Sequence, residues 1–150
     1  MIFQTWSREN NPAEKQFRID LVYLRMAEIW AENSYCKRCQ VGCLIVKDRT
    51  IISDGYNGTP TGFPNECEDK NNETIPLVLH AEANAITKLS KSTISSVGST
   101  IYLTLSPCYD CAKLIIQAGI KRVVFKEIYR NTSAFNLFET ANIEAINIKY

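Results

Sequence analysis

The sequence predicts a three-layer α/β/α sandwich around a mixed five-stranded sheet. Four segments place apolar residues at helical spacing, five others are rich in β-branched residues, and helices alternate with strands through the second half. Of the 150 residues, 45% are hydrophobic and 22% are charged, which is typical of a globular protein. This length suits a single domain over residues 1–150.

A long helix and a hairpin are predicted in the first third of the chain. Helical periodicity runs from Pro12 to Ser34, and Asn11 suits the helix start because Asn caps free amides and Pro fits the first turn. The β-rich segments 41–47 and 50–53 are separated by Asp48 and Arg49, which predicts a hairpin. The stretch 55–74 holds three Gly, two Pro and four Asn, and so long a loop is more often functional than idle.

Helices and strands alternate in the rest of the predicted fold. Helical periodicity covers 80–89 and 108–118, and Gly119 stops the second of these helices. A further helix is expected at 132–141 with Thr132 or Ser133 as its cap. Strands are expected at 100–105, 122–125 and 143–149.

The charge balance argues against a nucleic-acid surface. The chain has 17 Lys and Arg against 16 Asp and Glu, without basic clusters. No apolar run approaches the roughly 20 residues that span a bilayer, and the N-terminal segment lacks a secretion pattern. We therefore expect a cytoplasmic protein (host cytoplasm if a phage encodes it) with neither polynucleotide nor membrane as its partner.

Six cysteines and a single histidine supply the candidate metal ligands. Disulfides in a short chain are typical of secreted proteins, so we expect reduced thiols that bind metal or pack in the core. Cys43 alternates with apolar residues in a predicted strand and is expected in the core.

His80, Cys108 and Cys111 indicate a zinc site. The cysteines are spaced i and i+3 at a helix start, so both sulfurs can reach one ion, and the helix N-terminus favours thiolates. Three protein ligands leave a tetrahedral zinc one open position, as in catalytic sites. Glu82 follows His80 by two residues and can carry a proton. The H-x-E and P-C-x-x-C pattern is typical of zinc nucleobase deaminases.

Four segments carry a resemblance to a known family: QVGCLIV (40–46), GYNGTPTG (55–62), HAEANAI (80–86) and STIYLTLSPCYDCAKLIIQAGIKRVVF (99–125). The sequence resembles the zinc-dependent cytidine deaminase superfamily. The glycine-rich segment and AKLIIQAGIK (112–121) are similar to its deoxycytidylate (dCMP) deaminase branch. The resemblance implies the cytidine-deaminase fold, catalytic Zn2+, and hydrolysis of dCMP to dUMP and ammonia for thymidylate supply.

The resemblance also implies substrate contacts. Glu82 would protonate N3 of the cytosine and help its amino group to leave after water activated by zinc attacks C4. The Ala81 amide and the Ser106 carbonyl would position the base, Asn57 would contact sugar or base, and Tyr129 would stack on the pyrimidine. A turn at Asn57 and a rim position for Tyr129 are the alternatives.

No single partner is predicted for the 5′-phosphate. Ser34 matches a serine of the family, but Asn33 stands where many relatives have Arg. The donors that could bind a phosphate are Ser34, Arg38, Lys113 and Arg130.

Regulation and assembly are implied by the same resemblance. The family is activated by dCTP and inhibited by dTTP, with Mg2+ accompanying the triphosphate, and its members are commonly hexamers. The long first helix with Trp30 could pack between subunits or simply in the core. The predicted effector loop consists of Gly55, Tyr56, Asn57, Gly58 and Gly62, with a plain flexible loop as the alternative.

The remaining cysteines allow two interpretations. Cys36 and Cys67 resemble ligands of a second, structural zinc in some relatives, although the chain has no second histidine. Together with Cys39 they could form an all-thiolate site completed by a fourth, unidentified ligand. Burial in the core is the alternative, because free cysteine is more often a small buried hydrophobic residue.

Two other functions compete with dCMP deamination. One is deamination of another substrate: free cytidine or deoxycytidine remains open, whereas the charge balance disfavours tRNA adenosine and single-stranded DNA. The other is a non-catalytic zinc-binding module. Glu82 argues against the second, because a structural zinc site has no use for a proton carrier.

Overall fold

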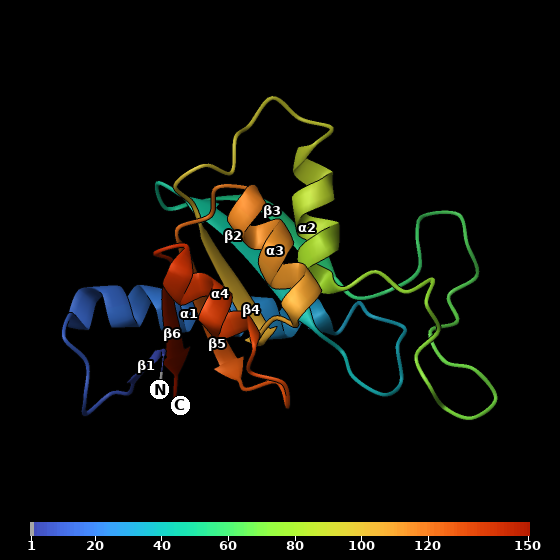
Figure 1. Ribbon diagram of the computed structural model, residues 1–150, viewed down its shortest axis with the longest axis horizontal. Helices are drawn as coiled ribbons and strands as arrows, with labels where there is room; N and C mark the ends of the chain where they lie inside the picture. Colours follow the sequence, from blue (N-terminus) through green and yellow to red (C-terminus); the bar gives the residue numbers. More distant parts are fainter. Residues whose placement is uncertain (1) are drawn as a thin grey trace.

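The structure, a computed structural model, describes residues 2–150, which form a mixed six-stranded sheet with helices on both faces (Figure 1). The sheet order is β1-β6-β5-β4-β2-β3, with β2 antiparallel to both neighbours and the other pairs parallel. The strands are β1 (Gln4–Trp6), β2 (Gly42–Lys47), β3 (Thr50–Tyr56), β4 (Thr100–Leu105), β5 (Arg122–Glu127) and β6 (Glu144–Ile148).

The expected five strands become six because of β1. Its three residues pair in parallel with β6 at the edge of the sheet, with Gln4 opposite Ile146. So short a segment shows no periodicity of its own, and its conformation is set by the neighbouring strand.

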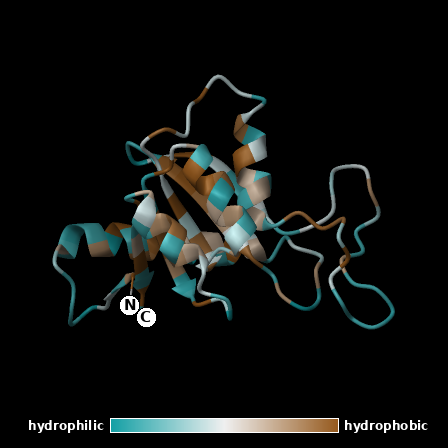
Figure 2. Ribbon diagram, viewed as in Figure 1, coloured by the Kyte–Doolittle hydropathy of each residue, from teal (hydrophilic) through white to brown (hydrophobic). Residues whose placement is uncertain are grey.

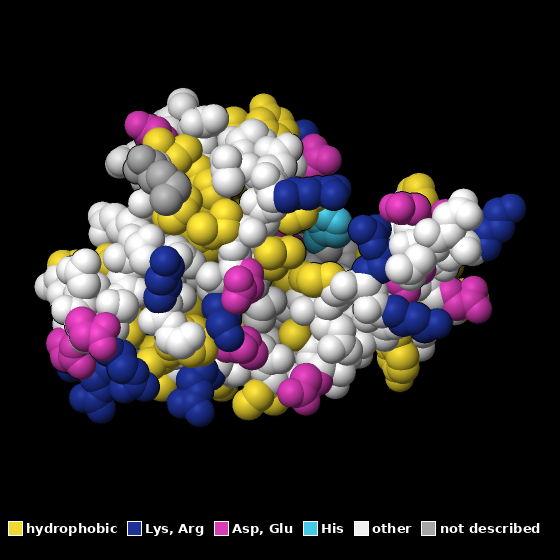
Figure 3. Space-filling model, turned by 90° about the horizontal axis from the view of Figure 1, so that it is seen from below, with side chains coloured by type: hydrophobic (Ala, Val, Ile, Leu, Met, Phe, Trp, Pro, Cys, Tyr) yellow, Lys and Arg dark blue, Asp and Glu magenta, His cyan; other side chains and the backbone are white. Residues whose placement is uncertain are grey.

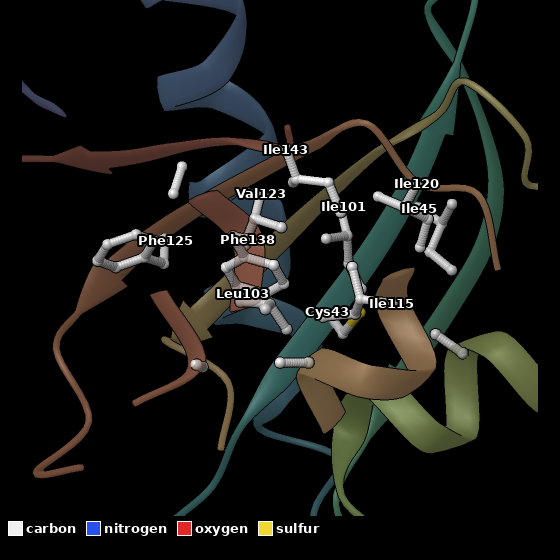
Figure 4. Close-up of a cluster of buried hydrophobic side chains, with 14 of the residues drawn as sticks. Cys43, Ile45, Ile101, Leu103, Ile115, Ile120, Val123, Phe125, Phe138 and Ile143 are labelled. Atoms are coloured by element: carbon white, nitrogen blue, oxygen red, sulfur yellow. The ribbon is translucent and has the colours of Figure 1, made fainter. Parts of the chain in front are cut away.

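Alternation along the strands sends side chains into two cores, one on each face of the sheet. Leu44 and Tyr102 pack on one face with α1 (Glu14–Ala31). Ile45 and Leu103 pack on the other face under α2 (Ala81–Leu89), α3 (Tyr109–Gln117) and α4 (Ala134–Thr140) (Figure 4). Figure 2 shows the hydrophobic residues concentrated in the sheet between these helices. The predicted three-layer α/β/α class is confirmed.

Helix α1 begins later than the sequence predicted. Its N-cap residue is Ala13, which has an extended backbone and no capping side-chain hydrogen bond. The amide of Asn11, the predicted cap, instead donates to the carbonyl oxygen of Ser7 at 2.9 Å. Ser133 is the N-cap residue of α4, but its side chain makes no capping bond either.

The predicted hairpin joins β2 and β3. Asp48 and Arg49 have φ of 50° and 58°, as the two central residues of a type I′ turn require. Strand β3 continues to Tyr56 because Gly55 still pairs with Cys43 of β2. Gly55 and Tyr56 therefore belong to the sheet and not to the loop in which they were expected.

A buried ion pair fastens α1 to the sheet. Asp20 is fully buried and accepts two hydrogen bonds from the Arg122 guanidinium, at 2.9 and 2.6 Å. The Tyr102 hydroxyl donates to the same carboxylate at 2.7 Å, so the buried charge is well satisfied. Burial raises the pKa of Tyr102, which keeps the hydroxyl protonated and able to donate.

A segment between β3 and α2 extends away from the sheet (Figure 1). Gly58 and Leu79 exchange two backbone hydrogen bonds, of 3.0 and 2.8 Å, at its neck, and we call residues 58–79 the projecting loop. Cys67 in this loop forms a disulfide with Cys36, which follows α1. The expectation that all thiols are reduced is therefore wrong for this pair, whose contact spans 31 positions of sequence.

The helices described within residues 2–150 are all too short or too polar to span a bilayer.

Candidate metal centre and substrate cavity

Two helix N-termini bring the predicted metal ligands together. His80 is the N-cap residue of α2, Cys108 is the N-cap residue of α3, and Cys111 lies in the first turn of α3. Helices α2 and α3 are in contact on the same face of the sheet (Figure 1). Three residues from two distant parts of the sequence therefore meet at one point.

The distances within this cluster fit a zinc ion. His80 Nδ1 lies 3.5 Å from Cys108 Sγ and 3.4 Å from Cys111 Sγ, and all three ligand atoms lie within 4.8 Å of one another. Zinc bonds of about 2.3 Å to sulfur and about 2.0 Å to nitrogen, at tetrahedral angles, separate the two ligand atoms by about 3.5 Å. The side chains could hold the ion where they stand, with a fourth position left open.

Hydrogen bonding prepares the thiols for metal binding. A hydrogen bond from Cys111, reinforced by His80, lowers the pKa of Cys108 to about 4. The same hydrogen bond, together with burial, raises the pKa of Cys111 above its ordinary value. The shifts have opposite directions because the Cys111 thiol donates to the Cys108 thiolate. A zinc ion would displace the remaining proton, because zinc binds thiolates.

Glu82 is a buried carboxyl beside the cluster. It lies in the first turn of α2 with 4% of its surface exposed, and it is not one of the three clustered ligands. Burial raises its pKa from the ordinary 4.5 to about 7. A carboxyl that titrates near neutrality can both accept and donate a proton, as general acid–base chemistry requires.

A cavity of about 560 Å³ opens over the cluster. Its volume falls within the roughly 300–1,000 Å³ that is usual for small-molecule sites. Figure 3 shows the histidine in this hollow, between the body of the protein and a projecting part, with Lys and Arg side chains near it. His80, Glu82 and Cys108 line the cavity, so the cluster is accessible from it.

Four of the five residues predicted to bind substrate line the same cavity: Asn57, Ala81, Ser106 and Tyr129. The first hydrogen bond of α2 runs from Asn84 N to His80 O, so the Ala81 amide has no partner within the helix. The Ser106 hydroxyl accepts a 2.7 Å hydrogen bond from the backbone N–H of Tyr129. This bond fixes the backbone of Tyr129 at the cavity rim.

Asn57 lines the cavity but also has a structural role. Its side-chain oxygen accepts a hydrogen bond from Val41 N, and its side-chain nitrogen donates to Cys39 O, both at 2.8 Å. Ser34 lies behind it and is not a lining residue, since its hydroxyl donates to the Asn57 carbonyl oxygen at 2.8 Å. The two predicted residues thus meet at the base of the projecting loop.

The glycine-rich segment is divided between strand and loop. Gly55 packs against α2, Tyr56 stacks edge-on against Trp30 of α1 with ring centroids 6.3 Å apart, and Gly58 forms the neck. Gly62 has a φ of 91°, a conformation that favours glycine. The proposed effector residues do not form a continuous loop, because the first two belong to β3.

Two of the candidate phosphate ligands reach the cavity. Arg38 and Arg130 line it, whereas Lys113 does not and pairs with Asp110 on α3. Arg38 pairs with Glu73 of the projecting loop at 3.2 Å. Among residues 2–150 no carboxylate forms an ion pair with Arg130, which lies against the ring of Tyr129.

The projecting loop contributes cavity residues that sequence reasoning missed: Glu68, Glu73, Thr74 and Val78. These residues belong to no sequence motif. The one residue of this segment that could have indicated their position is Cys67, because its bond to Cys36 brings the loop back to the cavity.

Comparison with known proteins places these residues in a family context. The family model described as the cytidine and deoxycytidylate deaminase zinc-binding region matches residues 18–127. ComE operon protein 2 of Bacillus subtilis is 38% identical over 126 residues, which cover 81% of this chain and 66% of that protein. The chain thus spans just under two thirds of that relative's length. The deoxycytidylate deaminase of Mycobacterium phage D29 is 35% identical over 120 residues, covering 71% of this chain and 92% of the phage protein.

A solved structure is similar over nearly the whole of both chains. The crystal structure of dCMP deaminase from the cyanophage S-TIM5 in complex with dCMP and dUMP matches with a TM-score of 0.84 and 40% identity. The match covers 92% of this chain and 98% of the cyanophage chain.

Proposed function

Because the chain belongs to the cytidine and deoxycytidylate deaminase family, we propose that it hydrolyses dCMP to dUMP and ammonia. The observation that carries the proposal is the His80, Cys108 and Cys111 cluster beside the buried Glu82, at the base of one open cavity. The dCMP and dUMP bound to a 40% identical cyanophage relative support the choice of substrate.

His80, Cys108 and Cys111 would hold the zinc ion. Zinc bound there supplies a Lewis acid that makes water nucleophilic near neutral pH. Glu82 would take a proton from the attacking water and deliver it to N3 of the cytosine. It would then pass the proton of the new C4 hydroxyl to the amino group, which leaves as ammonia. Its pKa of about 7 suits both directions of transfer.

The groups around the cluster would orient the base. The Ala81 amide can donate, the Ser106 carbonyl can accept, and the Tyr129 ring lies on the same rim. Asn57 is fixed by its two hydrogen bonds and can contact the sugar with its remaining N–H hydrogen and its remaining oxygen lone pair. Holding C4 next to the activated water in this way lowers the entropic part of the barrier.

Arg38 and Arg130 would bind the 5′-phosphate. They are the lysine or arginine side chains that line the cavity among the described residues, and a guanidinium can bind phosphate through two parallel hydrogen bonds. A phosphate contact would favour dCMP over free cytidine and deoxycytidine, the principal competing substrates.

Regulation and assembly are part of the same proposal. Activation by dCTP–Mg2+ and inhibition by dTTP–Mg2+ would act through the segment from Gly55 to Gly62, next to the exposed ring of Trp30. Assembly into a homo-oligomer would bury the exposed apolar side chains along α1, which are Val22, Met26, Ile29 and Trp30.

Ammonia release tests this proposal directly. Zinc-loaded protein is incubated with dCMP, deoxycytidine, cytidine or dCTP, each with and without dCTP–Mg2+ or dTTP–Mg2+. The proposal expects turnover of dCMP that dCTP raises and dTTP suppresses. Turnover of deoxycytidine or cytidine in preference to dCMP would contradict the substrate assignment, and no release from any of them would favour a non-catalytic zinc module.

A further inference from the structure

A disulfide joins the projecting loop to the segment that follows α1. Cys36 and Cys67 are both buried and lie 31 positions apart in the sequence. The proposed deamination makes no use of this bond, although it lies at the edge of the substrate cavity.

The other contacts across the same junction are polar and exposed. The Lys37 amide lies 3.2 Å from both carboxylate oxygens of Glu68. Arg38 pairs with Glu73 at 3.2 Å, but these side chains are 39% and 69% exposed. Exposed ion pairs contribute little because water and salt screen them. Beyond its neck, the loop is therefore held to this segment mainly by the disulfide.

The disulfide also borders the substrate cavity. Cys36 lines the cavity, and its sulfur lies 3.7 Å from the Asn57 carbonyl oxygen, the acceptor of the Ser34 hydroxyl. On the other side of the bond, the projecting loop supplies the lining residues Glu68, Glu73, Thr74 and Val78. Breaking the bond would free this wall while the metal ligands stay in place on α2 and α3.

We propose that the Cys36–Cys67 disulfide is a redox-controlled tether that sets the affinity of the cavity for its nucleotide. A thiolate of a dithiol reductant attacks the Cys36 sulfur from the cavity, and Cys67 leaves as a thiolate. The second thiol of the reductant then displaces Cys36 and closes the reductant's own disulfide. Two electrons and two protons pass from the reductant to the two cysteines, and exchange with an oxidised disulfide reverses the step.

The test compares zinc-loaded wild-type protein before and after reduction with dithiothreitol. Alkylation followed by mass spectrometry should find two additional thiols, at Cys36 and Cys67, with no change in zinc content. Reduction should raise KM for dCMP about tenfold, a typical size for coupling to a binding site, and leave kcat within about twofold. Trypsin cleavage at Lys70, inside the projecting loop, should become faster because the released loop opens more readily.

Two cysteine variants make the test specific. Cys67→Ser should show the KM of reduced wild type under both conditions, provided that its circular dichroism and zinc content show it folded. Cys39→Ser is the matched control, since Cys39 is an unbonded thiol that lines the same cavity, and it should keep the redox response. If Cys67→Ser does not fold, the comparison of oxidised with reduced wild-type protein is sufficient to test the proposal.

Two results would overturn the tether. One is equal KM and equal cleavage in both redox states. The other is an untreated protein with free Cys36 and Cys67 thiols and a second zinc ion per chain. The KM readout rests on the proposed function, whereas cleavage and thiol counts do not. Faster cleavage without any dCMP turnover would therefore refute the activity and keep only the redox-controlled release of the loop.

Discussion

Gly55 of β3 lies directly against Ala81, the first residue of α2. A Cβ at position 55 would be 2.4 Å from the Ala81 carbonyl oxygen and 2.8 Å from the Ala85 amide nitrogen. The strand and the helix are therefore too close for any side chain between them. Since His80 is the N-cap residue of α2, this contact helps to set the height of a metal ligand above the sheet.

Gly55→Ala should push α2 away from β3 and disturb the metal site. Forcing a methyl group into such a contact typically costs about 1–3 kcal/mol. We expect a lower free energy of unfolding in urea and less bound zinc. Gly58→Ala is the matched control because a Cβ there meets nothing within 4 Å, and its stability should stay within about 1 kcal/mol of wild type. Equal stability and zinc content in both variants would argue against this close approach.

Asp20→Asn should destabilise the fold far from the metal site. The substitution leaves the Arg122 guanidinium, which is largely buried, with only the more exposed Glu144 carboxylate as its counter-charge. Breaking a buried pair in this way costs about 3–5 kcal/mol. Urea unfolding followed by circular dichroism measures the loss. Lys113→Ala removes a highly exposed pair with Asp110 and should cost about 1 kcal/mol or less. Similar losses of unfolding free energy in the two variants would mean that the buried pair stabilises the fold no more than the exposed pair does.

Cys108→Ala should abolish stoichiometric zinc binding. Two remaining ligands cannot hold the ion with the affinity of three, and Cys108 supplies the thiolate with the lowered pKa. Elemental analysis of purified protein gives the zinc content. Cys43→Ala is the control, because that thiol is fully buried in the core and lies outside the ligand cluster. One zinc ion per chain in Cys108→Ala would remove Cys108 from the ligand set.

Arg130→Gln should weaken dCMP binding selectively. Loss of a charge-assisted hydrogen bond of about 1.5–3 kcal/mol corresponds to a KM about 10–100 times higher. Deoxycytidine has no phosphate, so its kcat/KM should change little and serves as an internal reference. Lys91→Gln removes an equal charge beyond the C-terminal end of α2, and it should leave kcat/KM unchanged for both substrates. An equal loss for dCMP and deoxycytidine in Arg130→Gln would exclude a phosphate contact.

Much of the fold could be predicted because its elements have strong local patterns. The strand at Thr100–Leu105 has the predicted bounds. The turn at Asp48 and Arg49 lies between the two β-rich segments, as predicted. Edge strand β1 is different, since three residues have no period and depend on β6 for their conformation. The start of α1 was also missed, because Asn11 bonds to Ser7 rather than capping the helix.

The metal cluster could be predicted from spacing, whereas the cavity around it could not. Cys108 and Cys111 are close in sequence, and a known pattern relates them to His80. The lining residues of the projecting loop depend on a disulfide between distant positions, which was not expected because the N-terminal segment lacks a secretion pattern. The double role of Asn57, which lines the cavity and bonds to Cys39 and Val41, likewise depends on how the loop folds back.

Conversion of dCMP to dUMP by wild type and by Glu82→Gln, at equal measured zinc content, shows whether Glu82 carries the proton in a zinc-dependent deamination of dCMP. Gln is isosteric with Glu but cannot carry the proton, so the variant should bind zinc and lose at least the 10²–10⁴-fold that general acid–base catalysis typically supplies. The absorbance change of the base, read on chromatographically separated nucleotides, gives both rates. Turnover in wild type that falls by this factor in the variant is the predicted result. Near-normal turnover in Glu82→Gln would exclude Glu82 as the proton carrier, and no turnover in zinc-loaded wild type would exclude dCMP deamination.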